Sequence, residues 1–135
     1  MPPPAILDPS TLDFSKLLAD REAIRQMIPH RFEFELLDAV LFADLESRVF
    51  AGYSDLREDA WWARGHIPGR PLFPGVLMVE TAAQLCSFFW RTHYPDEPRF
   101  FGFGGIESTR FRGTVGPGDR LVVAGKSIED RKSVV

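Results

Sequence analysis

Cysteine is almost missing from this 135-residue sequence, in which Cys86 is the only one. A single cysteine cannot form an internal disulfide, which fits a reducing compartment, so we expect a cytoplasmic protein. The sequence has neither a CxxC pair nor a cluster of His and Cys, and we therefore expect no metal site. Cys86 lies in an apolar segment, where it is most simply a small buried side chain.

Lysine is scarce as well, and the net charge is small. Only Lys16, Lys126 and Lys132 are present, so 13 of the 16 basic residues are arginine. Arginine suits forked contacts with carboxylates or phosphates, although a GC-rich genome would give the same bias. The net charge of −3 provides no general attraction to nucleic acids or membranes, and we expect neither as a partner.

Long uninterrupted apolar runs are also missing. The N-terminal residues MPPPAILDPS have neither the positive region nor the apolar core of a signal peptide. The apolar stretch over residues 76–90 is too short and too interrupted to span a bilayer. The 44% hydrophobic and 26% charged content is ordinary for a globular protein of one domain.

The pattern of apolar residues predicts one long helix set among strands. We expect an irregular N-terminal arm over residues 1–19 and a single domain over residues 20–135. Asp20 can cap a short helix over residues 21–28, which Pro29 ends. Strands are predicted at residues 32–42, 48–53, 99–111 and 120–128, with another beginning at Ser133. This order favours an α+β fold in which a curved antiparallel sheet wraps around a buried helix.

The stretch over residues 65–90, GHIPGRPLFPGVLMVETAAQLCSFFW, joins a rigid Pro/Gly loop to that helix. The helix is apolar on nearly every side, which predicts that it is buried all round. Glu80 is then anomalous, because a buried carboxylate is usually paired, neutral or functional. Gln84 lies one turn after Glu80 on the same face, and His66 lies in the loop. Considered one at a time, each residue also has a purely structural explanation. His66 could pack the loop, Glu80 could belong to a buried ion pair, and Gln84 could be a polar residue of the core.

Three blocks of the sequence resemble the β-hydroxyacyl-(acyl-carrier-protein) dehydratases of the FabZ/FabA group. GHIPGRPLFPGVLMVETAAQ at residues 65–84 is similar to the signature GHFPGxPxxPGVLxxEaxAQ. IPHRFEFELLDAV at residues 28–40 and FGGIESTRFRGTVGPGDRL at residues 103–121 match the two flanking blocks in the same order. Glu33 and Ile67 depart from the family pattern, which commonly has Pro and Phe there. The resemblance implies the hotdog fold, and we expect residues 20–135 to lack the family's C-terminal strands.

The reaction implied by the resemblance is loss of water from a (3R)-hydroxyacyl thioester to give the trans-2-enoyl thioester in fatty-acid biosynthesis. His66 suits the base, because a neutral imidazole is available near pH 7. Glu80 suits the acid, because apolar neighbours favour a protonated carboxyl group, and Gln84 could hold it. The start of the helix, at Gly75 and Val76, is a natural donor to the thioester oxygen.

The resemblance also implies the partners and the lining of the substrate site. We expect no cofactor, since the substrate is carried on the phosphopantetheine of acyl carrier protein. His66 of one subunit would face Glu80 of the other in a homodimer, and the family often assembles such dimers into hexamers. Residues expected to bind substrate are Ile67, Pro74, Phe101 and Phe103. Arginines that could meet the phosphopantetheine or an acidic carrier, or could simply be solvated charges, are Arg64, Arg70, Arg99, Arg110 and Arg112.

Two other functions remain open from the sequence. One is a catalytically weak hotdog protein that binds acyl carriers or serves as a structural subunit, a hypothesis motivated by the departures from the family pattern. The other is a hotdog thioesterase, which the GHxPG loop disfavours because that loop is typical of the dehydratases.

Overall fold

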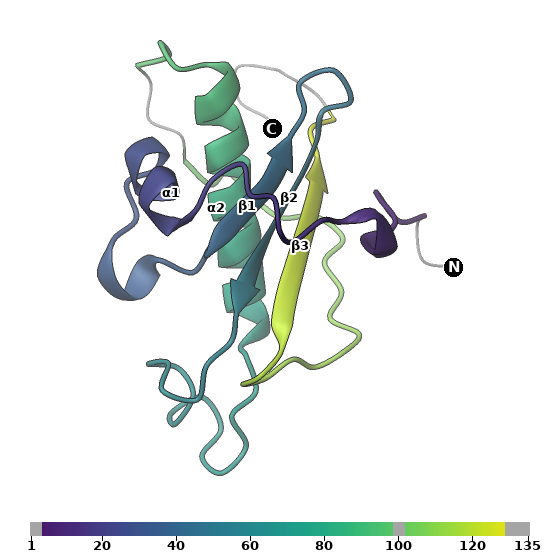
Figure 1. The fold of residues 1–135 in the computed structure, drawn as a ribbon. Coiled ribbons are helices and arrows are strands. Elements are labelled where there is room, and N and C mark those ends of the chain that lie inside the picture. The colour runs from purple at the N-terminus through teal and green to yellow at the C-terminus, as the bar shows by residue number, and fades with distance from the viewer. Residues whose placement is uncertain (1–3, 99–101, 129–135) are drawn as a thin grey trace.

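A three-stranded antiparallel sheet and one long helix form the framework of the protein (Figure 1). The computed structural model describes residues 4–98 and 102–128. The strands are β1 (Ala39–Ala43), β2 (Val49–Asp55) and β3 (Arg120–Lys126), in the order β1-β2-β3. The register pairs Ala39 with Tyr53 and Ala51 with Ala124, with an irregularity in β1 between Val40 and Phe42. The predicted α+β architecture with an antiparallel sheet is confirmed.

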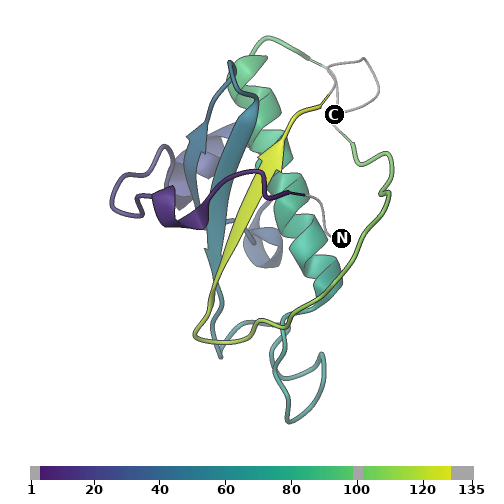
Figure 2. The ribbon, with the colours of Figure 1, turned by 90° about the vertical axis from the view of Figure 1, so that its right-hand side faces the viewer.

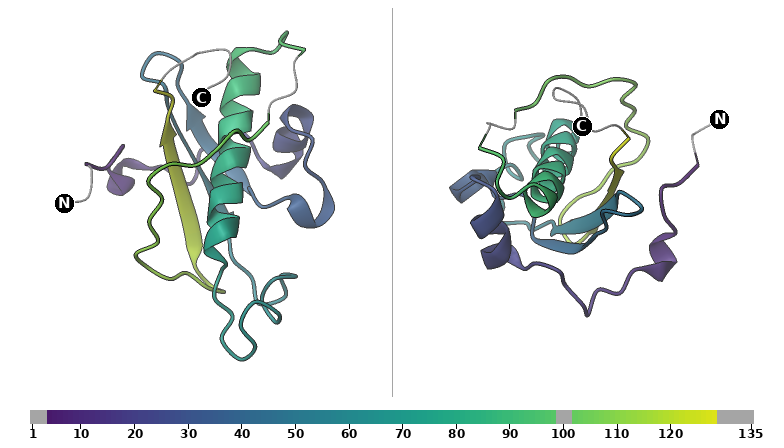
Figure 3. Two further views of the ribbon diagram at one scale, coloured as in Figure 1. Left: turned by 180° about the vertical axis from the view of Figure 1, so that it is seen from behind. Right: turned by 90° about the horizontal axis from the view of Figure 1, so that it is seen from above.

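The long helix α2 (Gly75–His93) crosses one face of this sheet, which curves around it (Figure 3). Its inward face is fully buried at Thr81, Gln84, Leu85, Phe88 and Phe89. Leu85 and the two phenylalanines form the main core. They pack with Val40 and Phe50 of the sheet and with residues of α1. Burial of these side chains away from water is the main force that joins helix and sheet.

The prediction that α2 is buried all round is wrong for the single chain. Val76 is 74% exposed, and the side chain of Glu80 is 30% exposed. The described strands cover one side of α2 and α1 packs beside it, while the irregular segment over residues 102–119 runs past the helix on another side (Figures 2 and 3). Several large apolar side chains of that segment are exposed, namely Phe103, Ile106 and Phe111.

The short helix α1 (Arg21–Met27) confirms the capping prediction. The Asp20 side chain accepts a hydrogen bond from Ala23 N at 2.9 Å, and the helix ends just before Pro29. Ile24 and Ile28 are each 4% exposed and join the main core. The chain before α1 contains the 3₁₀ turn η1 (Pro9–Thr11) and reaches the sheet where Ala19 N donates to Val40 O.

Two strand predictions need correction. Residues 32–42 were expected to be one strand, but Phe32–Phe34 form a 3₁₀ turn, η2, and β1 starts only at Ala39. Phe32 has φ of 58°, which a strand cannot accommodate. The strand expected at residues 99–111 is not seen in residues 102–111, which pair with no strand in the described part of the chain, and residues 99–101 lie outside the described residues. The strand expected from Ser133 lies outside the described residues.

The predictions at residues 48–53 and 120–128 are confirmed by β2 and β3 within about two residues. In residues 4–98 and 102–128, no helix is both long and apolar enough to cross a membrane.

Candidate active site

The imidazole of His66 is oriented by a carbonyl of its own loop. His66 Nδ1 lies 2.8 Å from Leu72 O, and its backbone N donates to Trp62 O at 3.0 Å. A carbonyl oxygen can only accept, so Nδ1 carries a proton, and in the neutral tautomer of this ring Nε2 has the lone pair. The residue is exposed, as a base that meets a substrate must be. The loop therefore fixes the tautomer in which Nε2 can remove a proton.

Aromatic packing holds the loop around His66 in place. Trp62 is 5% exposed and packs edge-on against Phe73, with ring centroids 4.9 Å apart. Gly69 has φ of +81°, a conformation that favours glycine, and Arg70 N donates to Ile67 O to close the turn. Trp61 instead lies at the surface, where its Nε1 donates to Glu33 O at 3.1 Å. The loop is thus held at both ends while its tip projects outward.

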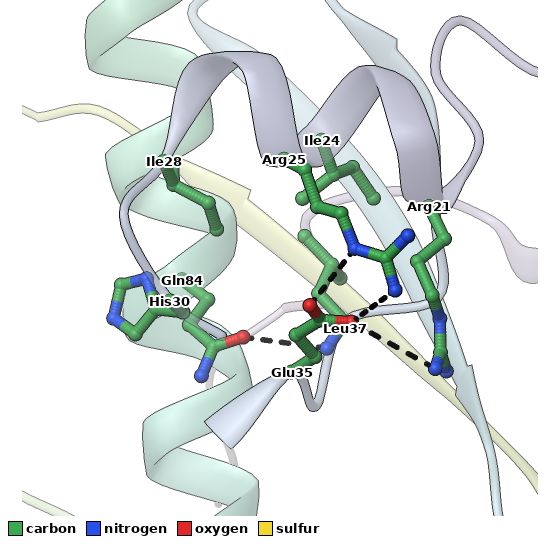
Figure 4. Close-up of a pocket in the computed structure, with 8 residues that line it drawn as sticks. All are labelled: Arg21, Ile24, Arg25, Ile28, His30, Glu35, Leu37 and Gln84. Carbon is green, nitrogen blue, oxygen red and sulfur yellow. Dashed lines mark hydrogen bonds and ion pairs between the residues drawn. The ribbon is translucent and has the colours of Figure 1, made fainter. Parts of the chain in front are cut away.

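Gln84 holds Glu80 from inside the core. Gln84 is 1% exposed, and its Nε2 donates to Glu80 Oε1 at 3.1 Å and to Phe34 O at 2.7 Å. Its Oε1 accepts from the backbone N of Leu36 and Leu37, each at 3.3 Å; Figure 4 shows it pointing from α2 towards Leu37. The predicted contact between Gln84 and Glu80 is present, and every polar atom of the Gln84 amide has a partner.

His30 approaches the same carboxyl group. His30 Nε2 lies 3.6 Å from Glu80 Oε1, and the two side chains are 25% and 30% exposed. The contact joins residues 50 positions apart in the chain, so only the IPHR block could have pointed to it from the sequence. His30 and Gln84 also line a cavity of about 10 Å³ between α1 and α2 (Figure 4). A cavity of that size is too small for an acyl chain.

The segment that holds Gln84 is tied to α1 by ion pairs. Arg25 donates from Nε and from one Nη to the two oxygens of Glu35, both at 2.8 Å (Figure 4). These hydrogen bonds hold the pKa of Glu35 below its ordinary value, against the opposing effect of burial. Arg21 pairs with Asp38, whose other oxygen accepts from Asp55 N at 2.6 Å. The backbone that contacts Gln84 is therefore fixed at both of its ends.

The first turn of α2 presents backbone donors beneath an aromatic ring. Pro74 is the N-cap residue and has no side-chain cap, and within the described residues the N–H groups of Gly75 and Val76 have no partner. A Cβ on Gly75 would lie 3.0 Å from Cε1 of Phe111. The helix dipole adds partial positive charge at this point. The Phe111 ring packs so closely on Gly75 that a larger residue would crowd it, and the role of Gly75 and Val76 as donors to the thioester oxygen stays a prediction.

The structure brings some of the predicted residues together and leaves others apart. Among the described interactions, His66 and Glu80 share no hydrogen bond or ion pair within the chain. Ile67 and Phe103 are 41% and 60% exposed, and Phe101 lies outside the described residues. The contribution of Ile67, Pro74, Phe101 and Phe103 to substrate binding stays a prediction.

Comparison with known proteins gives a consistent result. The family model described as "FabA-like domain" matches residues 28–135. A protein of Saccharophagus degradans named "3-hydroxyacyl-[acyl-carrier-protein] dehydratase FabZ" is 33% identical over 120 residues, which cover 87% of this chain and 82% of that protein. A protein of Thiobacillus denitrificans with the same name is 33% identical over 118 residues, covering 85% of this chain and 81% of that protein.

Proposed function

The chain belongs to the FabA-like family and has its hotdog fold, and from this premise we propose that it is a 3-hydroxyacyl-[acyl-carrier-protein] dehydratase. The enzyme is a hydro-lyase of fatty-acid biosynthesis. The observation that carries the proposal is the hydrogen bond between Nδ1 of the exposed His66 and Leu72 O, which leaves Nε2 to act as the base. A rigid loop with a prepared base suits proton removal next to a carbonyl.

The reaction needs one base, one acid and one oxyanion donor. Nε2 of His66 takes a proton from the carbon next to the thioester carbonyl. The electrons of that C–H bond form the C=C bond while the C–O bond to the 3-hydroxyl breaks. Glu80 gives its proton to the departing hydroxyl, which leaves as water, and the N–H groups at Gly75 and Val76 hold the negative charge that develops on the thioester oxygen. One substrate thus gives one enoyl thioester and one water.

The active unit of this proposal is a homodimer with shared sites. His66 lies in the loop before α2 and Glu80 lies within α2. Among the described interactions no hydrogen bond or ion pair joins them within one chain, which is consistent with each acting together with a second subunit. Apolar side chains beside α2 remain exposed at Val76, Ile106 and Phe111, and a second subunit would bury them. His66 of one subunit then faces Glu80 of the other. Assembly of such dimers into hexamers is compatible with this arrangement.

The substrate reaches the enzyme on acyl carrier protein. The substrate named for the two relatives is linked to this carrier, and four of the five candidate arginines lie in the described part of the chain, all of them exposed: Arg64, Arg70, Arg110 and Arg112. Arginine is well suited to a phosphate on the carrier's phosphopantetheine.

The identity of the product tests this function. Purified protein is incubated with a (3R)-hydroxyacyl thioester of acyl carrier protein, and the thioester species are separated by mass. A loss of water to give the trans-2-enoyl thioester supports the dehydratase. Release of the carrier's free thiol would instead identify a thioesterase, and binding of the carrier without turnover by a folded dimer would identify a carrier-binding subunit.

A further inference from the structure

We propose that His30 is a positioning residue for the Glu80 carboxyl group, acting together with Gln84. The inference rests on the proposed role of Glu80 as the acid. His30 Nε2 lies 3.6 Å from Glu80 Oε1, the same oxygen that accepts from Gln84 Nε2 at 3.1 Å. Hydrogen bonds at catalytic groups are often long before substrate binds and shorten afterwards. Two N–H donors therefore converge on one oxygen of the acid.

The Gln84 amide cannot rotate to release that oxygen. Its Oε1 is engaged by two backbone N–H groups, and its Nε2 is shared between Phe34 O and Glu80 Oε1. With the amide fixed, Oε1 of Glu80 is defined as the acceptor oxygen. Oε2 is then the oxygen that carries the proton for the departing hydroxyl.

The surroundings of His30 favour the tautomer that can donate a hydrogen bond to Glu80. His30 Nδ1 is buried and has no hydrogen-bond partner among the described residues. A proton on Nδ1 would leave a buried donor unsatisfied and would set the lone pair of Nε2 against Oε1 of Glu80. A proton on Nε2 places a donor beside Oε1 instead. Of the two tautomers, the one with its proton on Nε2 is therefore favoured.

The two residues that flank His30 hold it in place, which gives a physical reason for the PHR motif. Pro29 follows the end of α1 and prevents the helix from continuing. Arg31 donates from one Nη to Ile28 O at 2.9 Å and to His30 O at 2.7 Å, and from the other to Arg25 O at 2.9 Å. These bonds fix the backbone of the turn, and so the ring of His30 is held against Glu80.

The predicted effect is on the chemical step. When Glu80 gives up its proton it becomes a carboxylate, and both N–H donors stabilise the new charge. His30 acts through Glu80 and not through a contact with the substrate. Loss of the His30 donor should therefore lower kcat and leave KM nearly unchanged.

A matched pair of variants tests this. His30→Gln keeps an N–H donor, whereas His30→Met has a side chain of similar length and no N–H donor. We expect His30→Met to lower kcat about 10- to 100-fold, the usual effect of a lost hydrogen bond to a charged group, and His30→Gln to recover most of it. A thermal unfolding transition shows that each variant is folded. If His30→Met does not fold, His30→Phe keeps the ring shape without nitrogen and replaces it.

His93 provides the control for removing a histidine. Its Nε2 is also buried without a partner among the described residues, and its ring packs against Phe89. It lies 13 residues after Glu80 on α2, which is about 20 Å along the helix axis. His93→Met should leave kcat unchanged.

A double-mutant cycle separates failure of this inference from failure of the proposed function. If His30 acts through Glu80, adding His30→Met to Glu80→Gln lowers kcat no further. Full kcat in folded His30→Met, or an equal loss in both backgrounds, overturns the role of His30 while leaving the dehydratase intact. Full activity of Glu80→Gln alone would instead remove the acid on which the inference rests.

Discussion

The amide of Gln84 donates to Glu80 Oε1 at 3.1 Å from a position that is itself 1% exposed. The same amide bonds to the backbone of Phe34, Leu36 and Leu37 across the core. One residue thus orients the proposed acid and fixes the chain between η2 and β1. Stability and catalysis are coupled at this point.

Gln84→Met tests that coupling. The substitution keeps the length of the side chain but leaves two backbone N–H groups and one carbonyl without their partner. We expect the free energy of unfolding to fall by about 3 kcal/mol, since each buried polar group left unsatisfied is costly. Denaturant titration measures the change, and the folded fraction should also show reduced dehydratase kcat.

Gln26→Met is the matched control for Gln84. Gln26 makes one long contact of 3.4 Å with Glu22 at the surface of α1. Its replacement should change the free energy of unfolding by less than about 0.5 kcal/mol. Equal destabilisation by the two substitutions would contradict the role given to Gln84.

Gly75→Ala probes the start of α2. The new Cβ would lie 3.0–3.2 Å from three carbons of the Phe111 ring and beside the proposed thioester site. We expect kcat/KM to fall about 100-fold, because a displacement of about 1 Å at a reacting group has an effect of that size. Steady-state kinetics measures it, with Gly113→Ala as control because a Cβ there meets nothing within 4 Å. Unchanged kinetics in Gly75→Ala would remove Gly75 from the site.

Low pH should weaken the ion pair between Arg25 of α1 and Glu35, which lies in the segment that contacts Gln84. Hydrogen bonds from Arg25 lower the pKa of Glu35 from its ordinary value of 4.5. The stability that this pair contributes is therefore fully present above about pH 4.5 and is lost as the pH falls through the lower pKa of the folded state. Arg25→Met should thus lower the free energy of unfolding most near neutral pH, and the difference from the wild type should shrink in acid.

Arg57→Met is the control for Arg25. Arg57 pairs with Asp59 in the same forked way, but the two side chains are 71% and 70% exposed. Exposed pairs contribute little to stability.

A difference between wild type and Arg25→Met that is the same at every pH would show that packing, and not the ion pair, is responsible.

Mixing two inactive variants tests the shared site. His66→Ala and Glu80→Gln homodimers each lack one catalytic group in both sites. If the site is formed across the dimer, random exchange of subunits yields about a quarter of the wild-type activity, because half of the dimers are mixed and one of their two sites is intact. Exchange is followed with two affinity tags. Mixed dimers that stay inactive would contradict sites shared in this way.

Local features of the fold were predicted well from the sequence. Asp20 and Pro29 mark the ends of α1 by short-range chemistry. The two-residue period over residues 48–53 located β2, although this central strand is buried on both faces. The Pro/Gly loop and the apolar run likewise locate α2 to within a few residues. In each case the determining interactions lie within a few positions of the chain.

The failed predictions depend on partners far away in the sequence. Phe34 is held in a turn by Gln84, 50 residues later, so its apolar character misleadingly suggested a strand. Residues 102–111 have the composition of a strand but pair with no strand among the residues that the structure describes. The contact of His30 with Glu80 has the same long-range character. The apolar pattern of α2 predicts burial but does not say whether the covering surface belongs to the same chain.

The most direct test of the account is the rate of enoyl thioester formation by the wild type, His66→Ala and Glu80→Gln at equal concentrations of folded protein. Removal of a general acid or base typically costs about 10²- to 10⁴-fold, and we predict a loss in that range for each variant. The carrier thioester should still bind to both. Wild-type rates in either variant would contradict the assignment of His66 as base and Glu80 as acid.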